Sequence, residues 1–523
     1  MNQHSKRDFV VVQLLQFRDI VSIRLRIRSH RVTVPIELER GVGKKAPLYR
    51  QIAEQITDQI CSGRLTIGAR LPTVRELASQ LDVTVVTVQN AYAELQEAGL
   101  AEAVVGRGTF VTRPEPADPA ALLSDGRRTS DVMADMVRLE RNLREVYPLA
   151  QANANDDLSP EAAFFRCLRA AEPEGASSLR YGHPQGCPTL RGELCELLAG
   201  RDLDARADEL IVTQGVTQGL DLLLTVLCKP GDTVVVEEPT YLGLLGLLEL
   251  HGVTAVGVPL DAEGPDLRRL ERVLRSERPR MFYTTATFQN PTGICMSEQR
   301  RHDLLALAEN YDLLLVEDDI YRDIALTVDP PPPLKALPGG RELVVYLDGF
   351  AKSLVPGLRI GYMIPPPDLY GPLLDAHRLR TLCGPLVMQT AFTEFLRRGE
   401  RELHLERVLP IFRERREVML ESLGESMPED AEWTDPAGGL CIWLTLPEGV
   451  CTHETYRAAL SAGVSVAPGD HFMPRSTARG HLRLAFGGLP TTEIPTAIRV
   501  LSDVIRAATT RSGRGEREAV PLV

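Results

Sequence analysis

The residues with the clearest chemistry stand in the segment Gly349-Phe350-Ala351-Lys352 and at Arg359, seven positions after the lysine. An apolar run, 344–347, precedes this segment and is typical of a buried strand. A partly neutral lysine amine is a nucleophile for an aldehyde, and cationic neighbours lower its pKa toward that state. The segment therefore predicts a lysine that bonds to a carbonyl carbon, with an arginine placed to bind an anion.

Four more residues supply what a pyridoxal phosphate site requires. Asp318 follows the strand-like run 313–317 and would keep the pyridine nitrogen protonated. Tyr321 and Asn290 would donate hydrogen bonds to the phenolic oxygen of the cofactor, and Tyr241 would stack on its ring. Together they predict a site for pyridoxal 5′-phosphate in which the lysine is the Schiff-base residue.

The phosphate of such a cofactor also needs a cradle. The segment 213–218 joins a strand-like run to a helix-like run, so the backbone N–H groups of Gly215, Val216 and Thr217 would lie at a helix N-terminus. Helix N-termini bind phosphate because their first N–H groups are unpaired. Arg359 would bind the same phosphate group. His183 has no cluster of ligand residues around it, so we expect no metal.

A different pattern occupies the N-terminal region. An apolar stripe predicts a helix over about 47–62, and Thr73 with Glu76 forms a capping box at the start of a second helix. Thr84 is placed to cap a third helix, and 101–111 reads as two short strands. This order predicts a helix-turn-helix followed by a wing, which is a DNA-binding arrangement.

Charge is distributed unevenly along the chain of 523 residues. The net charge of −12 divides into +5 over residues 1–113 and −17 over the remainder, which fits a small nucleic-acid module on an acidic body. The nine cysteines include no C-x-x-C pair, so reduced thiols are expected. No uncharged run approaches the roughly 20 residues that span a bilayer. We therefore expect a cytoplasmic protein.

The pattern of apolar runs divides the chain into five segments. From residue 160 onward, short apolar runs alternate with longer amphipathic segments, which predicts a mainly parallel α/β sheet. The segments are an extension (1–45), the DNA-binding domain (46–113), a linker (114–159), the large domain (160–507) and a tail (508–523).

The block 71–78, together with Gly106-Arg107-Gly108-Thr109-Phe110-Val111, resembles the GntR-type winged helix. The resemblance implies four residues at the DNA surface: Arg75, Thr84, Thr87 and Arg107. That family usually has arginine directly after the capping residue, where this chain has Val85. A phosphate or base contact is then absent, and Val85 or Val86 would instead touch a thymine methyl group.

Residues 178–490 resemble the fold-type I aminotransferases, specifically the MocR-like regulators in which this fold is fused to a GntR-type winged helix. The resemblance implies a homodimer, in which Tyr181 reaches the phosphate of the neighbouring subunit. It also implies that Arg483 pairs with an effector carboxylate, and that Gly438-Gly439 lies beside the pocket.

The chain departs from that family just before the lysine. Asp348, Gly349 and Ala351 stand where glycine, threonine and serine are usual, so two hydroxyl groups are absent and an acid lies nearby. Each hydrogen bond lost to a charged phosphate would weaken cofactor binding by roughly 1.5–3 kcal/mol.

Three hypotheses follow. The first is a transcriptional regulator that holds pyridoxal phosphate and senses a small amine or amino acid. The second is an active aminotransferase of class I/II with an appended DNA-binding head. The third is a regulator whose pocket no longer holds cofactor, so that the large domain only dimerises.

Overall fold

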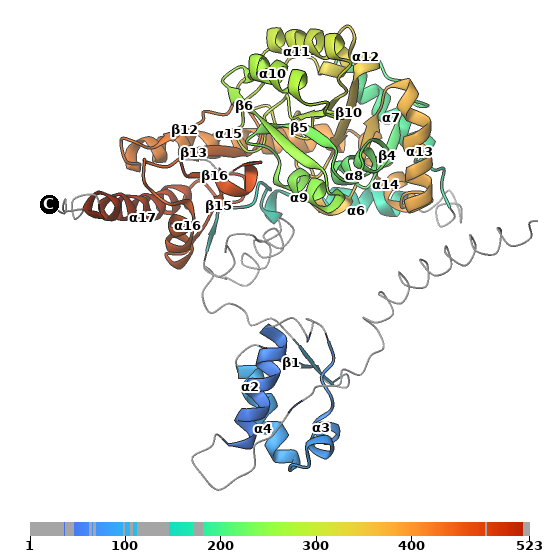
Figure 1. Ribbon diagram of the computed structural model, residues 1–523. Coiled ribbons are helices and arrows are strands. Elements are labelled where there is room, and N and C mark those ends of the chain that lie inside the picture. Colours follow the sequence, from blue (N-terminus) through green and yellow to red (C-terminus); the bar gives the residue numbers. More distant parts are fainter. Residues whose placement is uncertain are drawn as a thin grey trace, which may run out of the picture. The chain divides into compact units, whose positions relative to one another are not determined.

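The computed structural model describes residues 36, 47–61, 65, 69–97, 100–104, 108–111, 146–171, 181–475 and 479–515. The chain divides into two units, 1–118 and 119–523, and Figure 1 shows the elements of both. None of the helices in these ranges is long and apolar enough to cross a membrane.

The small unit is a helix-turn-helix with a hairpin, as the sequence predicts. Its elements are α2 (Leu48–Cys61), α3 (Val74–Leu81), α4 (Val85–Glu97), β1 (Ala101–Val104) and β2 (Gly108–Val111). Helix α3 begins with the predicted capping box between Thr73 and Glu76. Ile52, Leu77 and Val88 are fully buried between the three helices, so each helix contributes an apolar face to one core.

Two contacts fix the hairpin and the turn of this unit. The Leu71 N–H donates to the Thr109 carbonyl (2.9 Å), which ties β2 to the start of α3. The Tyr92 hydroxyl of α4 donates to the Pro72 carbonyl (2.7 Å). Asp82 adopts the left-handed conformation, φ 49°, that turns the chain from α3 into α4. Arg107 lies outside the described residues.

The large unit contains, among its described residues, an eight-stranded sheet in the order β4-β11-β10-β9-β8-β5-β6-β7. Strand β11 is antiparallel to both neighbours and β7 is antiparallel to β6, while the other pairs are parallel. The mainly parallel sheet predicted from the sequence is therefore confirmed. The strands are β4 (Ile211–Thr213), β5 (Thr233–Glu238), β6 (Thr254–Asp261), β7 (Gly264–Pro265), β8 (Phe282–Thr284), β9 (Leu315–Asp318), β10 (Val344–Gly349) and β11 (Gly361–Ile364).

Helices cover both faces of this sheet (Figure 1). Strand β10 alternates between the faces: Val345 and Leu347 pack with α8 and α9, whereas Tyr346 packs with α7 and α14. Such a strand is apolar on both sides because neither face meets water. The helices are α6 (Glu161–Ala170), α7 (Pro188–Ala199), α8 (Val216–Leu227), α9 (Leu242–His251), α10 (Leu267–Ser276), α11 (Glu298–Tyr311), α12 (Gly340–Leu343), α13 (Pro367–Thr381) and α14 (Leu386–Arg397). Short 3₁₀ turns are η2 (Asp156–Leu158), η5 (Leu334–Ala336), η6 (Pro356–Leu358) and η7 (Gly469–Phe472).

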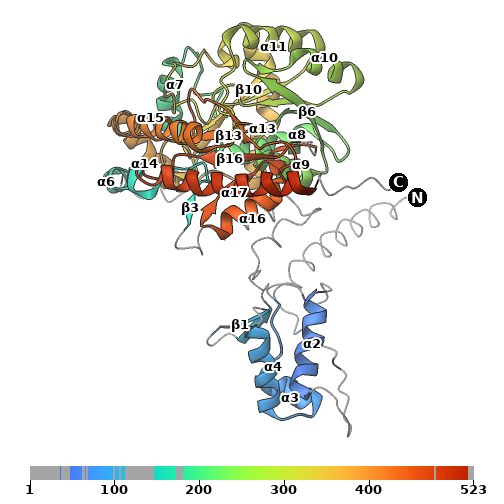
Figure 2. The same cartoon turned by 90° about the vertical axis from the view of Figure 1, so that its left-hand side faces the viewer.

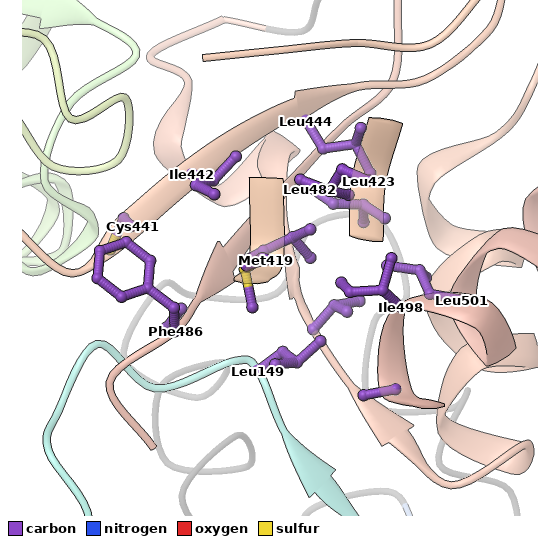
Figure 3. Close-up of a cluster of buried hydrophobic side chains, with 14 of the residues drawn as sticks. Leu149, Met419, Leu423, Cys441, Ile442, Leu444, Leu482, Phe486, Ile498 and Leu501 are labelled. Carbon is purple, nitrogen blue, oxygen red and sulfur yellow. The ribbon is translucent and has the colours of Figure 1, made fainter. Parts of the chain in front are cut away.

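A second, four-stranded sheet, in the order β12-β13-β16-β15, packs against the C-terminal helices (Figure 2). Its core joins Met419 and Leu423 of α15 to Ile442 of β13, Leu482 of β16 and Ile498 of α17 (Figure 3). The elements are α15 (Glu400–Ser426), β12 (Glu432–Trp433), β13 (Cys441–Thr445), α16 (Thr452–Ser461), β15 (Ala467–Pro468), β16 (His481–Ala485) and α17 (Ile494–Gly515).

The large unit begins earlier than the boundary expected at residue 160. Strand β3 (Tyr147–Pro148) pairs with β14 (Val464–Ser465), and Leu149 is fully buried in the C-terminal core. Their apolar run is too short to show a period, so the sequence pattern alone places them in the linker. At the other end, α17 continues to Gly515, beyond the expected boundary at 507.

Candidate functional site

A cavity of about 250 Å³ opens at the carboxyl ends of β8, β9 and β10, beside the N-terminus of α8. Open α/β sheets bind ligands at this edge, where strand ends and helix N-termini meet. Nine of the ten residues expected to bind the cofactor line this cavity: Gly215, Val216, Thr217, Tyr241, Asn290, Asp318, Tyr321, Lys352 and Arg359.

Lys352 follows β10 and directs its amine into the cavity. The Nζ atom donates to the Ala152 carbonyl (3.1 Å) and to Oδ1 of Asn153 (2.9 Å). Burial lowers the pKa of Lys352 to about 8, and the positive charges of Arg483 and Arg359 act in the same direction. A substantial share of this amine is therefore neutral near physiological pH, as a nucleophile requires.

Asp318 ends β9 and is buried. Its Oδ2 accepts a hydrogen bond from the Tyr283 hydroxyl (2.7 Å), and its Oδ1 accepts one from the Ile320 N–H (3.3 Å). No ion pair between described residues involves Asp318, and burial raises its pKa to about 7. A buried carboxylate without a cation is costly, so the geometry favours a cationic ligand atom here.

The tyrosines of the cavity fit a ring bearing a phenolic oxygen. The Tyr321 hydroxyl lines the cavity, is buried, and has no hydrogen-bond partner among the described residues. Buried hydroxyls are nearly always paired, so this one is placed for an atom of a ligand. The Tyr241 hydroxyl bonds to Thr217, and its ring packs against Gly243, where a side chain would collide with it. These residues therefore fit pyridoxal phosphate.

The phosphate end is built on the N-terminus of α8. Gly215 caps this helix with φ 89°, a conformation that strongly favours glycine. The Arg359 Nη2 donates to the Gln214 carbonyl (2.7 Å), which places the guanidinium beside Gly215. Unpaired helix N–H groups and a guanidinium then face the same end of the cavity, a combination suited to a phosphate.

Asp348 does not line the cavity, although the sequence placed it near the phosphate. Its Oδ2 accepts from Arg201 Nη1 (2.7 Å) and from the Tyr362 hydroxyl (2.8 Å). Burial raises the pKa of Asp348, and the Arg201 charge opposes that shift. Asp348 is therefore paired in the protein interior with Arg201, which belongs to no motif that can be recognised in the sequence.

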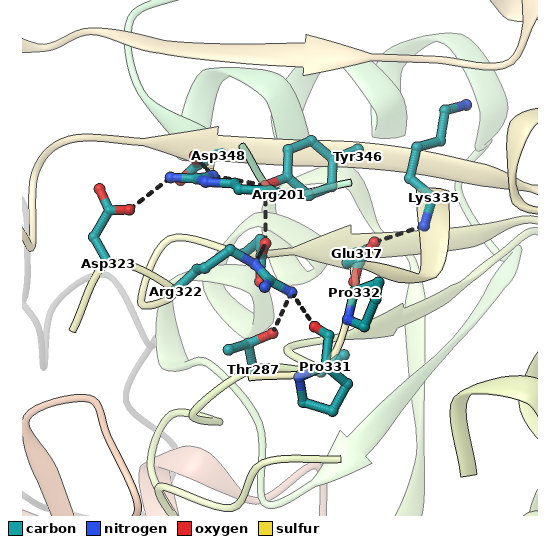
Figure 4. Close-up of polar contacts among 12 residues, drawn as sticks. Arg201, Thr287, Glu317, Arg322, Asp323, Pro331, Pro332, Lys335, Tyr346 and Asp348 are labelled. Atoms are coloured by element: carbon teal, nitrogen blue, oxygen red, sulfur yellow. Dashed lines mark hydrogen bonds and ion pairs between the residues drawn. The ribbon is translucent and has the colours of Figure 1, made fainter. Parts of the chain in front are cut away.

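Arg201 belongs to a buried polar network that includes Asp348 and Asp323 (Figure 4). It also donates to Asp323 (2.7 Å) and to the Tyr346 hydroxyl (2.9 Å), and Tyr346 donates onward to Asp319 (2.8 Å). Glu317 accepts from the backbone N–H groups at 334 and 335. The network ties the end of β9 to β10, the two strands that carry Asp318 and Lys352.

Two predicted residues lie outside the cavity lining. Tyr181 is 83% exposed and does not line the cavity of its own chain. Arg483 is buried beside the cavity. Its Nη1 donates to Asn290 Oδ1 (3.2 Å) and its Nη2 donates to the Ala150 carbonyl. Its Cζ atom lies 4.8 Å from the centre of the Phe472 ring.

Sequence reasoning missed several residues of the site. Asn153 lines the cavity and accepts a hydrogen bond from Lys352. Tyr283 also lines it and donates to Asp318, and Thr285 donates to the Tyr283 hydroxyl (3.3 Å). Asn153 stands 199 positions from its lysine, so no local spacing points to it. Tyr283 sits in an apolar strand, where a tyrosine is most often part of the core.

Of the predicted DNA-contacting residues, Thr84 and Thr87 lie at the start of α4 and Arg75 lies at the start of α3. Arg75 and Thr84 are exposed, and Thr87 is half-buried. The Thr84 and Thr87 hydroxyls bond to each other (2.8 Å), and Thr84 also caps the helix through the Thr87 N–H (3.2 Å). Val85 and Val86 are 43% and 60% exposed on the first turn.

Comparison with known families matches both units. Residues 149–501 match the model of aminotransferase class I and II. The chain belongs to this family. Residues 48–111 match the gntR family of bacterial regulatory proteins, so the aminotransferase-type unit is fused to a GntR-type DNA-binding domain, the MocR-like arrangement. Pyridoxal phosphate is the cofactor of the family.

Similar proteins include both enzymes and regulators. The chain is 35% identical to aromatic-amino-acid aminotransferase 1 of Thermococcus litoralis, over 64% of this chain and 82% of that protein. It is 29% identical to an uncharacterized HTH-type transcriptional regulator, YdfD of Bacillus subtilis, over 90% and 98% of the two chains. The crystal structure of the α-aminoadipate aminotransferase LysN from Thermus thermophilus, complexed with N-(5′-phosphopyridoxyl)-L-leucine, superposes with a TM-score of 0.67 at 31% identity, covering 71% and 95%.

Gly361→Ala tests the phosphate end of this aminotransferase-family regulator. A Cβ at residue 361 would lie 2.7 Å from the Cα of Gly215 and 2.9 Å from the Asp348 carbonyl oxygen, both backbone atoms. Overpacking of this kind costs about 1–3 kcal/mol of folding stability, and displacing the Gly215 backbone relieves it. Cofactor binding must then restore that backbone, so we expect pyridoxal phosphate to bind about tenfold more weakly in a fluorescence titration. Gly357→Ala is the control, because its Cβ meets nothing within 4 Å. Equal affinity in both variants would contradict the role given to this loop.

The pKa of Lys352 predicts how cofactor attachment depends on pH. The neutral amine attacks an aldehyde, so the rate should rise about tenfold per pH unit below pH 8 and level off above it. The measurement is the absorbance change on mixing with pyridoxal phosphate across about pH 6.5–10.5. Arg483→Gln should move the midpoint upward, since the Arg483 charge helps to lower this pKa. A rate that keeps rising to the pKa of an exposed lysine would show that the amine is not perturbed.

Proposed function

We propose that this regulator holds pyridoxal phosphate in the cavity and senses a small amine or amino acid, which alters its hold on DNA. The observation that carries the proposal is the cavity itself, which gathers nine expected cofactor residues in a chain that also has a GntR-type domain. The unpartnered Tyr321 hydroxyl and the uncompensated Asp318 support the same cofactor.

The residues divide the work of binding. When bound, the cofactor supplies an aldehyde carbon at which one primary amine replaces another. Lys352 would supply the amine that anchors the cofactor, and burial keeps part of that amine neutral. Asp318 would balance a protonated ring nitrogen, and Arg359 with the α8 N-terminus would bind the phosphate. Arg483 would pair with the effector's carboxylate.

The second hypothesis, an active aminotransferase, is favoured by the 35% identity to an enzyme of that class. Two features favour sensing over turnover. Gly349 and Ala351 provide no hydroxyl groups at the phosphate end, and the DNA-binding unit is retained in the same chain. Sustained production of a keto acid from an amino acid would support the enzyme, whereas a single round of binding would support the sensor.

We also propose that the protein acts as a homodimer. Three large side chains are exposed on this part of the large unit: Tyr181 (83%), Leu379 (83%) and Leu382 (56%). The Gly182 N–H donates to the Cys383 thiol (3.2 Å), and this contact brings the segment of Tyr181 beside the segment of Leu379 and Leu382. Large exposed apolar side chains gathered together mark interfaces, and a second copy would bring Tyr181 to its partner's phosphate.

Paired variants test the regulator. Lys352→Ala should abolish the visible absorbance of bound cofactor and the response of DNA binding to amines, because the amine that anchors the aldehyde is gone. Arg75→Ala should keep the absorbance and lose affinity for DNA in a gel-shift assay at moderate salt. If the unmutated protein shifts none of the fragments from its own genomic neighbourhood, the regulator hypothesis fails.

The valines at the start of α4 predict sensitivity to thymine methyl groups. After selecting bound DNA from a random pool with the full chain, each thymine of the selected site is replaced by deoxyuridine. Loss of the contacted methyl should weaken binding about fourfold, from about 0.8 kcal/mol per buried methyl-sized group. The variant Val85→Ala/Val86→Ala should be indifferent to the same replacement. A wild-type protein that tolerates deoxyuridine at every position would refute this contact.

A further inference from the structure

One short segment is held by both of the residues that a ligand would engage. Arg483 Nη2 donates to the Ala150 carbonyl. Lys352 Nζ donates to the Ala152 carbonyl (3.1 Å) and to Asn153 Oδ1 (2.9 Å). The three acceptors lie within four consecutive residues, and Asn153 also lines the cavity. We name residues 150–153 the contact segment.

The contact segment lies near the start of the described part of the large unit, on the side of the chain that leads to the DNA-binding unit. It directly follows β3 and Leu149, where the described part of the large unit begins at residue 146. On its other side, Asn155 Oδ1 accepts from Arg415 Nη1 (3.0 Å), a contact outside the cavity. The chain on either side of the segment is therefore anchored by the large unit, and its alanines are buried, Ala150 beside Phe472 and Ala152 in the C-terminal core. Among the described residues, the side-chain hydrogen bonds that reach the segment from distant parts of the chain come from Arg483 and Lys352.

The hydrogen bonds to the contact segment compete with those to a ligand. A lysine nitrogen bonded to an aldehyde carbon has too few protons to donate to two carbonyl groups as the free ammonium does. Arg483 Nε has no partner among the described residues, so a carboxylate would bind at the edge formed by Nε and Nη2. That carboxylate would then compete with the Ala150 carbonyl for Nη2.

We propose that the contact segment reports the state of the site to the chain leading to the DNA-binding unit. Resting on the function proposed above, the segment has three states. In the free protein Arg483 holds Ala150 and Lys352 holds residues 152–153, and residues 152–153 are released when Lys352 is bonded to the cofactor. These residues are held again when an amine frees the lysine. A carboxylate on that amine separately releases Ala150.

Amide hydrogen exchange on the full, unmutated chain tests these states. Exchange at residues 151–155, where the Asn153 and Asn155 N–H groups bond to the backbone, should become several-fold faster with pyridoxal phosphate. Exchange in α10, which contributes no residue to the cavity lining, should not change. Methoxyamine, which displaces the lysine but has no carboxylate, should restore the slow rate, whereas aminooxyacetate should restore it only in part. Identical exchange with and without cofactor would overturn the proposal.

A pair of variants gives a second test. Asn153→Ala removes one acceptor of the Lys352 amine, so pyridoxal phosphate should bind about tenfold tighter because that bond no longer has to be broken. The change in DNA affinity caused by the cofactor should shrink. Asn155→Ala loosens the same stretch through Arg415, outside the site, and should leave cofactor affinity unchanged. Unchanged or weaker cofactor binding in Asn153→Ala would contradict the proposal.

The two levels of hypothesis fail differently. A protein that never gains the absorbance of bound cofactor, or never binds DNA, refutes the proposed function. A second outcome is a protein that binds both cofactor and DNA and changes its DNA affinity when an amine is added. If exchange at residues 151–155 then stays constant, only the role of the contact segment is refuted. The exchange measurement needs no variant, so a misfolded mutant cannot leave the question open.

Discussion

Three consecutive acids at the end of β9, residues 317–319, are buried, and each is stabilised by different neighbours. Glu317 accepts from backbone N–H groups and lies near Arg301, and Asp319 pairs with Arg322 and the Tyr346 hydroxyl. Alternation along the strand turns Asp318 the other way, where only neutral donors reach it. Because buried charges need counterions, this asymmetry makes Asp318 the acid left for a cationic ligand. The arrangement of the cavity depends on that difference between neighbours.

Local patterns in the sequence were sufficient for the elements that carry the site. The capping box at Thr73, the strand before Lys352 and the turn at Gly215 are all short-range signals, and each appears where it was expected. The contacts that complete the site are not local. Asn153, Tyr283 and Arg201 meet their partners across long stretches of chain, and nothing in their own neighbourhoods distinguishes them from core or surface residues.

Packing is close at residue 349, where the usual threonine hydroxyl is missing. A Cβ there would lie 3.3 Å from the Ile360 carbonyl oxygen and 3.4 Å from the Cα of Gly361, so the glycine lets β10 and β11 approach closely at the phosphate end. Asp348 is likewise committed to Arg201 and Tyr362. Asp348 and Gly349, two of the departures from the usual aminotransferase pattern, thus both pack against β11.

The pairing of Arg483 with Ala150 joins residues 333 positions apart. On a ribosome, the winged helix is complete after about a fifth of the chain has emerged, and its contacts are local, so it can fold at once. The ligand site must wait, because β3 and the contact segment find their places only when β14 and β16 arrive near the end of synthesis. Each newly made molecule therefore has a folded DNA-binding unit before its ligand site exists.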